Sequence, residues 1–131
     1  MKLTFSWIDA PVGRSYPVCM TDRENSEGED LVARVLDDDG GLGVEMAIQW
    51  IEEGKRLANE ALAGASGPLY WTREYFGVEI LGNQTIASDH HDPVNKVCLP
   101  TEAFASALQR WQEFLIAGPS AESHTVEINV C

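Results

Sequence analysis

The chain has 131 residues, 44% of them hydrophobic, and its 21 acidic residues against 9 basic ones give a formal net charge of −12. This composition predicts one domain spanning residues 1–131 and excludes both a disordered chain and a membrane protein. An acidic chain repels nucleic acid and anionic membranes and associates faster with a basic protein. We therefore expect no nucleic-acid and no membrane partner.

The N-terminal quarter predicts two strands and leaves a third segment open. Residues 2–8 alternate between apolar and polar side chains, as in a half-buried strand, and a short second strand is expected to end near Val18–Met20. Residues 21–30 are polar without apolar spacing and predict a solvated loop. The run LVARVL, residues 31–36, fits a strand and a helical turn equally well.

The middle of the chain predicts a long helix followed by three strands. Apolar residues recur every three or four positions over residues 43–63, which is typical of an amphipathic helix. Gly54 lies inside it and costs about 1 kcal/mol relative to alanine, which suggests close packing there. Strands at 76–81 and 85–87 flank a Gly-Asn turn, a hairpin signal, and 94–99 adds a third strand.

A second helix and a last strand complete the predicted architecture. Residues 101–117 carry a helical apolar stripe, with Thr101 as the expected N-cap, and residues 124–130 alternate as in a strand. The predicted fold is α+β: a single domain with an antiparallel-rich sheet of about five strands and two main helices packed on it.

The stretch LDDDGGLGVEM carries three consecutive aspartates, Asp37, Asp38 and Asp39, followed by two glycines. An EF-hand starting at Asp37 needs glycine at its sixth position and glutamate at its twelfth, but Leu42 and Ile48 stand there, so the pattern fails. Two readings stay open. The stretch is a turn whose acids favour the start of the following helix, or it is a surface for a basic partner.

The segment SDHHD contains the residue types of metal sites and of acid–base catalysis: Asp89, His90, His91 and Asp92. Adjacent side chains in a strand point to opposite faces, and no spacing places both histidines together. We interpret the segment as a surface loop at a hairpin end, with partner contact as the functional alternative. Trp71, which follows a Gly-Pro break, is expected to be partly exposed and is a further interface candidate.

The three cysteines, Cys19, Cys98 and Cys131, are far apart, so neither a disulfide framework nor a metal knuckle is expected. Cys98 lies in an apolar strand and is predicted to be a buried, inert thiol.

The chain contains no nucleotide-binding or nucleophile motif, so no cofactor, metal or catalytic residue is predicted. Its N-terminus lacks the apolar core of a secretory signal, and a cytoplasmic location is expected.

The segments YFGVEILGNQTIAS and VCLPTEAFASALQRWQEFL form a strand, a Gly-Asn turn, a strand and a helix ending in W-x-x-F-L. Over residues 70–117 this layout resembles the small acidic immunity proteins encoded beside bacterial polymorphic toxins, including those of contact-dependent growth inhibition. The resemblance implies a cytoplasmic, non-catalytic protein that neutralises a cognate toxin domain, plausibly a nuclease with a basic cleft. Candidate partner-binding residues are Asp37, Asp38, Asp39, Trp71, Asp89, His90 and Asp92. The alternatives are a small metal-dependent or hydrolytic enzyme using Asp89–Asp92, and a structural or interaction subunit.

Overall fold

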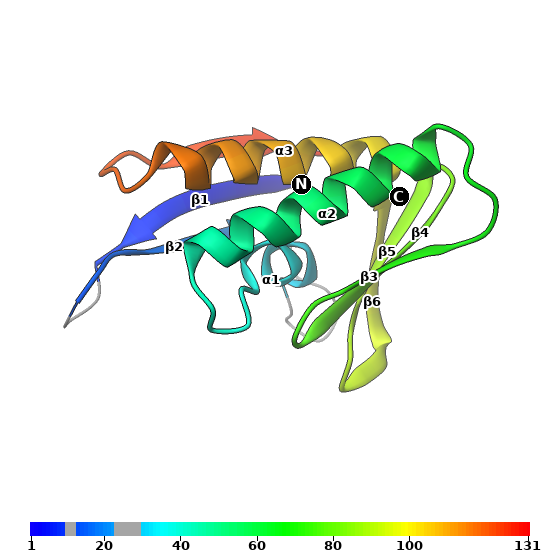
Figure 1. Cartoon of the computed structure of the whole chain (residues 1–131), viewed down its shortest axis with the longest axis horizontal. Coiled ribbons are helices and arrows are strands. Elements are labelled where there is room, and N and C mark those ends of the chain that lie inside the picture. The colour runs from blue at the N-terminus through cyan, green and yellow to red at the C-terminus, as the bar shows by residue number, and fades with distance from the viewer. Residues whose placement is uncertain (10–12, 23–29) are drawn as a thin grey trace.

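The computed structural model of the chain describes residues 1–9, 13–22 and 30–131, which contain seven strands and three helices (Figure 1). The elements are, in chain order, β1 (Lys2–Ile8), β2 (Tyr16–Thr21), α1 (Leu31–Asp37), α2 (Val44–Leu62), β3 (Leu69–Thr72), β4 (Phe76–Leu81), β5 (Gln84–Asp89), β6 (Asp92–Pro100), α3 (Thr101–Ala117) and β7 (His124–Glu127). The predicted α+β class is confirmed. Most of the loop predicted at residues 21–30 lies outside the described residues.

The strands form two antiparallel sheets, where the sequence predicted one sheet of about five strands. The first sheet has the order β2-β1-β7, and the second is a meander with the order β3-β4-β5-β6. β3 was not predicted, because its four residues follow a glycine and a proline and are too few to show an alternating pattern. Across the described ranges, no helix combines the length and apolar character needed to cross a bilayer.

α3 joins the two sheets, because it contacts β5 and β6 of one sheet and β7 of the other. Against the first sheet its aromatic residues meet Phe5, whose ring centroid lies 5.0 Å from that of Trp111 and 5.6 Å from that of Phe114. At its start, Thr101 is not the predicted N-cap. Pro100 takes that position, and the buried hydroxyl of Thr101 shares a 3.0 Å hydrogen bond with the hydroxyl of Thr85.

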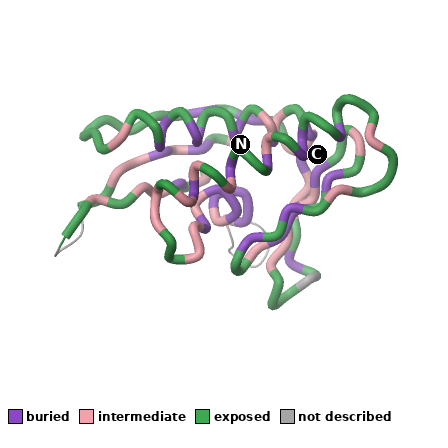
Figure 2. Tube along the Cα trace, in the orientation of Figure 1, coloured by how far each residue is buried: buried purple, intermediate pink, exposed green. Residues whose placement is uncertain are grey.

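α1 is buried along most of its length, and Figure 2 shows it as a purple coil in the middle of the molecule. Its five apolar residues are buried and contact β2, β4, β5 and β6, while Arg34 and Asp37 lie on the remaining side and pair with each other. Seven residues make only about two helical turns, too few for a helical period to show in the sequence. This is why the sequence alone could not separate a strand from a helical turn at residues 31–36.

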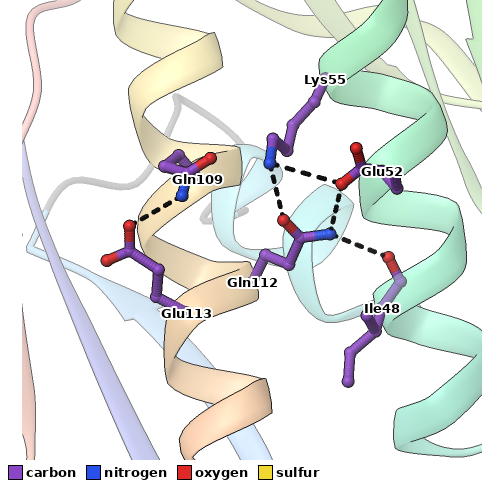
Figure 3. A network of polar contacts seen from close by, with 6 residues as sticks. All are labelled: Ile48, Glu52, Lys55, Gln109, Gln112 and Glu113. Atoms are coloured by element: carbon purple, nitrogen blue, oxygen red, sulfur yellow. Dashed lines mark hydrogen bonds and ion pairs between the residues drawn. The ribbon is translucent and has the colours of Figure 1, made fainter.

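α2 packs along α3, and a polar network bridges the two helices (Figure 3). The buried side-chain amide of Gln112 on α3 donates to the Glu52 carboxylate at 2.8 Å and to the Ile48 carbonyl at 3.3 Å. Its oxygen accepts from the Lys55 ammonium at 2.7 Å, and Lys55 also pairs with Glu52. Each polar atom of the buried amide is thereby satisfied, which keeps it from destabilising the interface.

Gly54 lies where α2 packs closely against Trp71 of β3. A Cβ atom built on Gly54 would lie 2.9 Å from Cε2 of Trp71, closer than side-chain carbons approach one another. The close packing predicted for this glycine is confirmed. Trp71 itself is buried with 4% of its surface exposed, so the prediction that it is partly exposed is wrong. It fills the space that the missing Gly54 side chain leaves open.

The C-terminal strand is shorter than predicted, and its end makes a covalent bond. β7 stops at Glu127 rather than continuing to residue 130, and the chain then reaches β6, where Cys131 forms a disulfide with Cys98. The cysteine positions, which implied no disulfide framework, did not reveal this bond, and the prediction of a buried, inert thiol at Cys98 is wrong. The two cysteines are 33 residues apart, so no local pattern in the sequence could indicate that they pair. Their pairing depends on how the sheets are arranged.

Candidate functional site

Asp37, the last residue of α1, closes an open edge of the first sheet. The free edge of β2 presents the backbone of Cys19, whose N–H donates to Oδ2 of Asp37 at 3.1 Å and whose carbonyl accepts from the Arg34 guanidinium. Arg34 and Asp37 also pair with each other at 3.2 Å. Two residues away on the same edge, Pro17 has no N–H to offer. The edge of β2 is thus blocked to a further strand at these positions.

The carboxyl group of Asp37 is ionised less readily than an exposed aspartate. Burial raises the pKa of Asp37 to about 6, while the Arg34 guanidinium and the Cys19 N–H act in the opposite direction. Asp38 and Asp39 add a smaller increase, because a neighbouring negative charge disfavours ionisation. This carboxyl group therefore changes protonation in a range where exposed aspartates are already ionised.

Asp38 ties the loop after α1 to the turn between β3 and β4. Only 8% of Asp38 is exposed. One of its oxygens accepts from the N–H of Gly40 at 3.1 Å and the other from the N–H of Tyr75 at 3.0 Å. Because the carboxylate of Asp38 is buried and both of its oxygens accept hydrogen bonds, its role is to hold the loop in place. Its side chain offers little surface to a partner.

Asp39 organises the turn that leads into α2. Its two oxygens accept from the N–H groups of Gly41 at 2.8 Å and Gly43 at 3.2 Å. Gly40, Gly41 and Gly43 have φ angles of 61°, 76° and 93°, which side-chain-bearing residues rarely adopt. The reading of this stretch as a turn that starts a helix is confirmed. Within the described part of the chain, no group of three or more His, Cys, Asp or Glu side chains could hold a metal ion.

Arg73 lies behind the loop that contains Asp38 and Asp39, and the sequence did not predict it as a residue of the site. Its guanidinium carbon is 4.7 Å from the ring centroid of Trp50 and 4.8 Å from that of Trp71, so it lies between two indoles. Only 4% of Arg73 is exposed, and its guanidinium nitrogens have no hydrogen-bond partner among the described residues. Burial lowers the pKa of Arg73 to about 10, opposed by the nearby aspartates. It remains a cation at neutral pH and offsets part of the charge of the aspartates.

The predicted surface loop after β5 meets the other side of the same turn. The N–H of His90 donates to the carbonyl of Tyr75 at 3.0 Å, and its Nε2 lies 3.1 Å from the carbonyl of Arg73. Because a carbonyl only accepts, Nε2 carries the hydrogen in this bond. A Cβ on Gly77 would lie 2.8 Å from Cε1 of His90, so the absence of a side chain at Gly77 leaves room for this imidazole. His91 is exposed.

The structure brings two acidic segments, about fifty residues apart in sequence, to the same turn between β3 and β4. We call this region the acidic rim. It consists of Asp37, Asp38, Asp39, Glu74, Asp89 and Asp92. Asp89 belongs to it because it pairs with both Phe76 and Asp92 in the sheet register. The loop after α1, the turn after β3 and the turn after β5 all extend toward the lower edge of the view in Figure 1.

The members of the acidic rim differ in exposure. Glu74 and Asp92 are exposed, Asp37, Asp39 and Asp89 are half-buried, and Asp38 is buried. An open hollow of about 320 Å³ lies between the aspartate loop and the turn after β3, lined by Arg34, Asp37, Asp38, Asp39, Gly40, Gly41, Tyr75 and Phe76. Tyr75, with 54% of its surface exposed, stands beside it. The rim therefore offers carboxylates next to an aromatic ring.

Sequence reasoning identified most members of the rim but not their proximity. Asp37–Asp39 and Asp89–Asp92 were candidates, whereas Glu74, Tyr75 and Arg73 were not, because they form a turn with no distinctive pattern. Trp71 lies behind the rim rather than on its surface.

No protein-family model, curated protein or solved structure matches the chain. The candidate site is therefore defined by its geometry and charge alone: an α+β protein with an acidic, partly aromatic rim.

Proposed function

We propose that this protein is a non-catalytic immunity protein that binds a basic toxin domain, such as that of a nuclease, through the acidic rim. The observation that carries the proposal is that Asp37–Asp39 and Asp89–Asp92 meet at one turn, with the exposed carboxylates of Glu74 and Asp92 at its surface. The resemblance of residues 70–117 to immunity proteins agrees with it. A cytoplasmic location belongs to the same proposal.

The charge of the rim suits a cationic partner. Six acidic residues contribute to it, and the two nearby arginines are engaged within the protein. Arg34 binds Asp37 and the Cys19 carbonyl, while Arg73 lies between two indoles. The exposed members, Glu74 and Asp92, have no ion pair within the described residues. A patch with this net negative charge speeds the diffusional encounter with a basic surface.

The hollow beside Tyr75 suits a lysine or arginine side chain of the partner. The aspartates that line the hollow provide carboxylate oxygens, which form strong hydrogen bonds with guanidinium and ammonium groups. Tyr75 and Phe76 provide aromatic surface against which a cation or its aliphatic stem can rest. A nuclease that binds phosphates carries such side chains in its cleft, and an inhibitor seated there would exclude the nucleic acid.

The proposal is tested with the toxin domain encoded next to this chain, co-expressed and co-purified with it. We expect a stable complex and protection of cells from the toxin. The charge reversals Glu74→Lys and Asp92→Lys should each slow association roughly tenfold at low ionic strength. Glu122→Lys is the matched control, because Glu122 is an exposed acid in the connection between α3 and β7, outside the rim.

Two outcomes would contradict the proposal. The first is the absence of both a complex and protection when the toxin domain is co-expressed. The second is a complex whose association rate falls equally for Glu74→Lys and Glu122→Lys, because the rim would then have no special part in binding. A salt titration separates charge steering from other causes, since the difference between the variants should disappear once added salt screens the rim.

A further inference from the structure

The last residues of the chain connect the two sheets. β7 ends at Glu127 in the first sheet, and Ile128 then exchanges two backbone hydrogen bonds with Met1. The Ile128 N–H donates to the Met1 carbonyl at 2.8 Å, and the Met1 amino group donates to the Ile128 carbonyl at 2.9 Å. Three residues later, the N–H of Cys131 donates to the carbonyl of Cys98 on β6 at 3.1 Å. Residues 128–131 therefore bridge from one sheet to the other.

The disulfide fixes this bridge covalently. Cys98 and Cys131 have Cα atoms 5.4 Å apart, within the range that a disulfide spans. The bond closes a loop that contains all of β7 and of α3, the helix that contacts both sheets. We call residues 128–131 together with the Cys98–Cys131 bond the C-terminal clasp.

The clasp also covers a strand edge. β6 is the last strand of its sheet, and the carbonyl of Cys98 accepts from Cys131 rather than from a further strand. Pro100, two residues along the same edge, has no N–H. An edge strand with free backbone groups is a template for pairing with another chain. Opening the clasp would uncover this edge at Cys98.

The three cysteines differ in their access to a reductant. Cys131 is exposed and Cys98 is half-buried, so a thiol in solution can approach the bond from the Cys131 side. Cys19 is buried, and burial raises the pKa of its thiol far above the usual range, with Asp37 adding to the effect. Because the thiolate is the reactive form, Cys19 does not take part in exchange with the other two.

We propose that the C-terminal clasp is a redox-controlled link, which a dithiol reductant opens so that the last residues leave β6. One thiolate of the reductant attacks Sγ of Cys131. The S–S bond breaks, and Cys98 leaves as a thiolate that takes a proton from water. The second thiolate of the reductant then displaces Cys131 from the mixed disulfide. The reductant ends as a disulfide, and the protein gains two electrons and two protons.

The inference goes beyond the proposed function, because the clasp lies away from the acidic rim. Asp92 of the rim stands at the start of β6, whereas Cys98 lies toward its other end. At the cytoplasmic location of the proposed function, where thiols are kept reduced, the clasp would be open, and it would close under oxidising conditions. In the reduced protein, within the described part of the chain, the two sheets would be held together only by the packing of α1 and α3 against both of them.

The test uses the 131-residue chain with and without dithiothreitol, followed by amide hydrogen exchange and mass spectrometry. Reduction should speed exchange in residues 96–100 and 124–131 and lower the urea midpoint of unfolding. Exchange at the turn over residues 73–76 should stay unchanged. The variant Cys131→Ser should show the fast exchange without reductant and should no longer respond to it, which separates bond cleavage from other effects of dithiothreitol.

Two results would overturn the proposal. One is an untreated protein in which an alkylating reagent labels both Cys98 and Cys131 after denaturation, since the bond would then be absent. The other is a reduced protein whose exchange at residues 96–100 and 124–131 equals that of the oxidised form. Loss of toxin binding in Glu74→Lys with a normal redox response would support the rim and the clasp as separate features.

Discussion

The side chain of Asp38 accepts a hydrogen bond from the backbone N–H of Tyr75 at 3.0 Å, which joins the loop after α1 to the turn between β3 and β4. The two residues are 37 positions apart, and neither belongs to a recognisable motif. On the far side of the turn, the carbonyl of Tyr75 accepts from the N–H of His90. Tyr75 thus lies between the two acidic segments, and its backbone holds both in place.

Replacing Asp38 should destabilise the fold, because its carboxylate is buried and both oxygens are occupied. In Asp38→Ala the N–H groups of Gly40 and Tyr75 lose their acceptor, and we expect the free energy of unfolding to fall by about 1–3 kcal/mol. Urea denaturation followed by tryptophan fluorescence measures the change. Asp92→Ala, at an exposed position, should stay within about 0.5 kcal/mol of the wild type. Equal effects of the two substitutions would contradict the structural role of Asp38.

The free energy of unfolding should fall as the pH rises from about 4 to 6, because Asp37 loses its proton in this range. Its pKa of about 6 in the folded protein lies above the ordinary value of 3.8, so the folded state binds the proton more tightly than the unfolded state in this range. This stabilisation is fully present at pH values below the pKa of Asp37 in the unfolded chain. It is lost as the pH rises through the pKa of Asp37 in the folded protein. It amounts to at most about 3 kcal/mol, at 1.36 kcal/mol per pKa unit.

Asp37→Asn isolates this effect, because asparagine can still accept from the Cys19 N–H but does not titrate. Urea midpoints measured at several pH values between about 4 and 7 should decline for the wild type and be flatter for the variant. Asp89→Asn serves as the control at a half-buried acid. A wild type and an Asp37→Asn variant with parallel pH profiles would show that Asp37 is not the titrating group.

Gly54→Ala should destabilise the protein although alanine favours helices. The new Cβ would lie 2.9 Å from the ring of Trp71, which is buried and cannot move aside freely. Overpacking of about 1–3 kcal/mol then exceeds the gain of about 1 kcal/mol in helix propensity. Thermal unfolding measures the balance. Gln49→Ala, on the exposed face of the same helix, should be neutral, and a gain in stability for Gly54→Ala would refute the contact.

Arg73→Lys should loosen the core beneath the acidic rim. A guanidinium is flat and can contact two indoles at once, as it does at 4.7 and 4.8 Å, whereas an ammonium cannot stack in this way. We expect a loss of about 1–2 kcal/mol from the weakening of these two cation–π contacts. Native tryptophan fluorescence should also change, because Trp50 and Trp71 lose their neighbour. Arg110→Lys, at an exposed site on α3, should alter neither property.

Gln112→Leu tests the network between α2 and α3. The substitution removes the hydrogen bonds to Glu52, Ile48 and Lys55, and it leaves the Lys55 ammonium with Glu52 alone. We expect about 1–3 kcal/mol of destabilisation, visible in urea unfolding. The matched control is Gln109→Leu one turn earlier, where the lost bond to Glu113 is exposed to water. A neutral Gln112→Leu would mean that apolar packing replaces the network fully.

Patterns that depend on neighbours in the sequence were predictable from the residues alone. The periodicity of α2 and α3 and the Gly-Asn turn between β4 and β5 gave elements within a residue or two of those observed, because helical and strand periods repeat along the chain. The glycines after Asp39 likewise marked a turn, since positive φ angles strongly favour glycine.

The residues alone were therefore enough to predict the α+β class, both long helices, the central hairpin and the surplus of acidic charge. Which distant segments meet depended on the tertiary packing. α1 is too short to show a helical period. Cys131 meets Cys98 because the segment after β7 reaches β6, and the Asp37–Asp39 loop meets the Asp89–Asp92 segment through the turn at Tyr75. Such contacts depend on how the layers pack in space, and no local spacing records them.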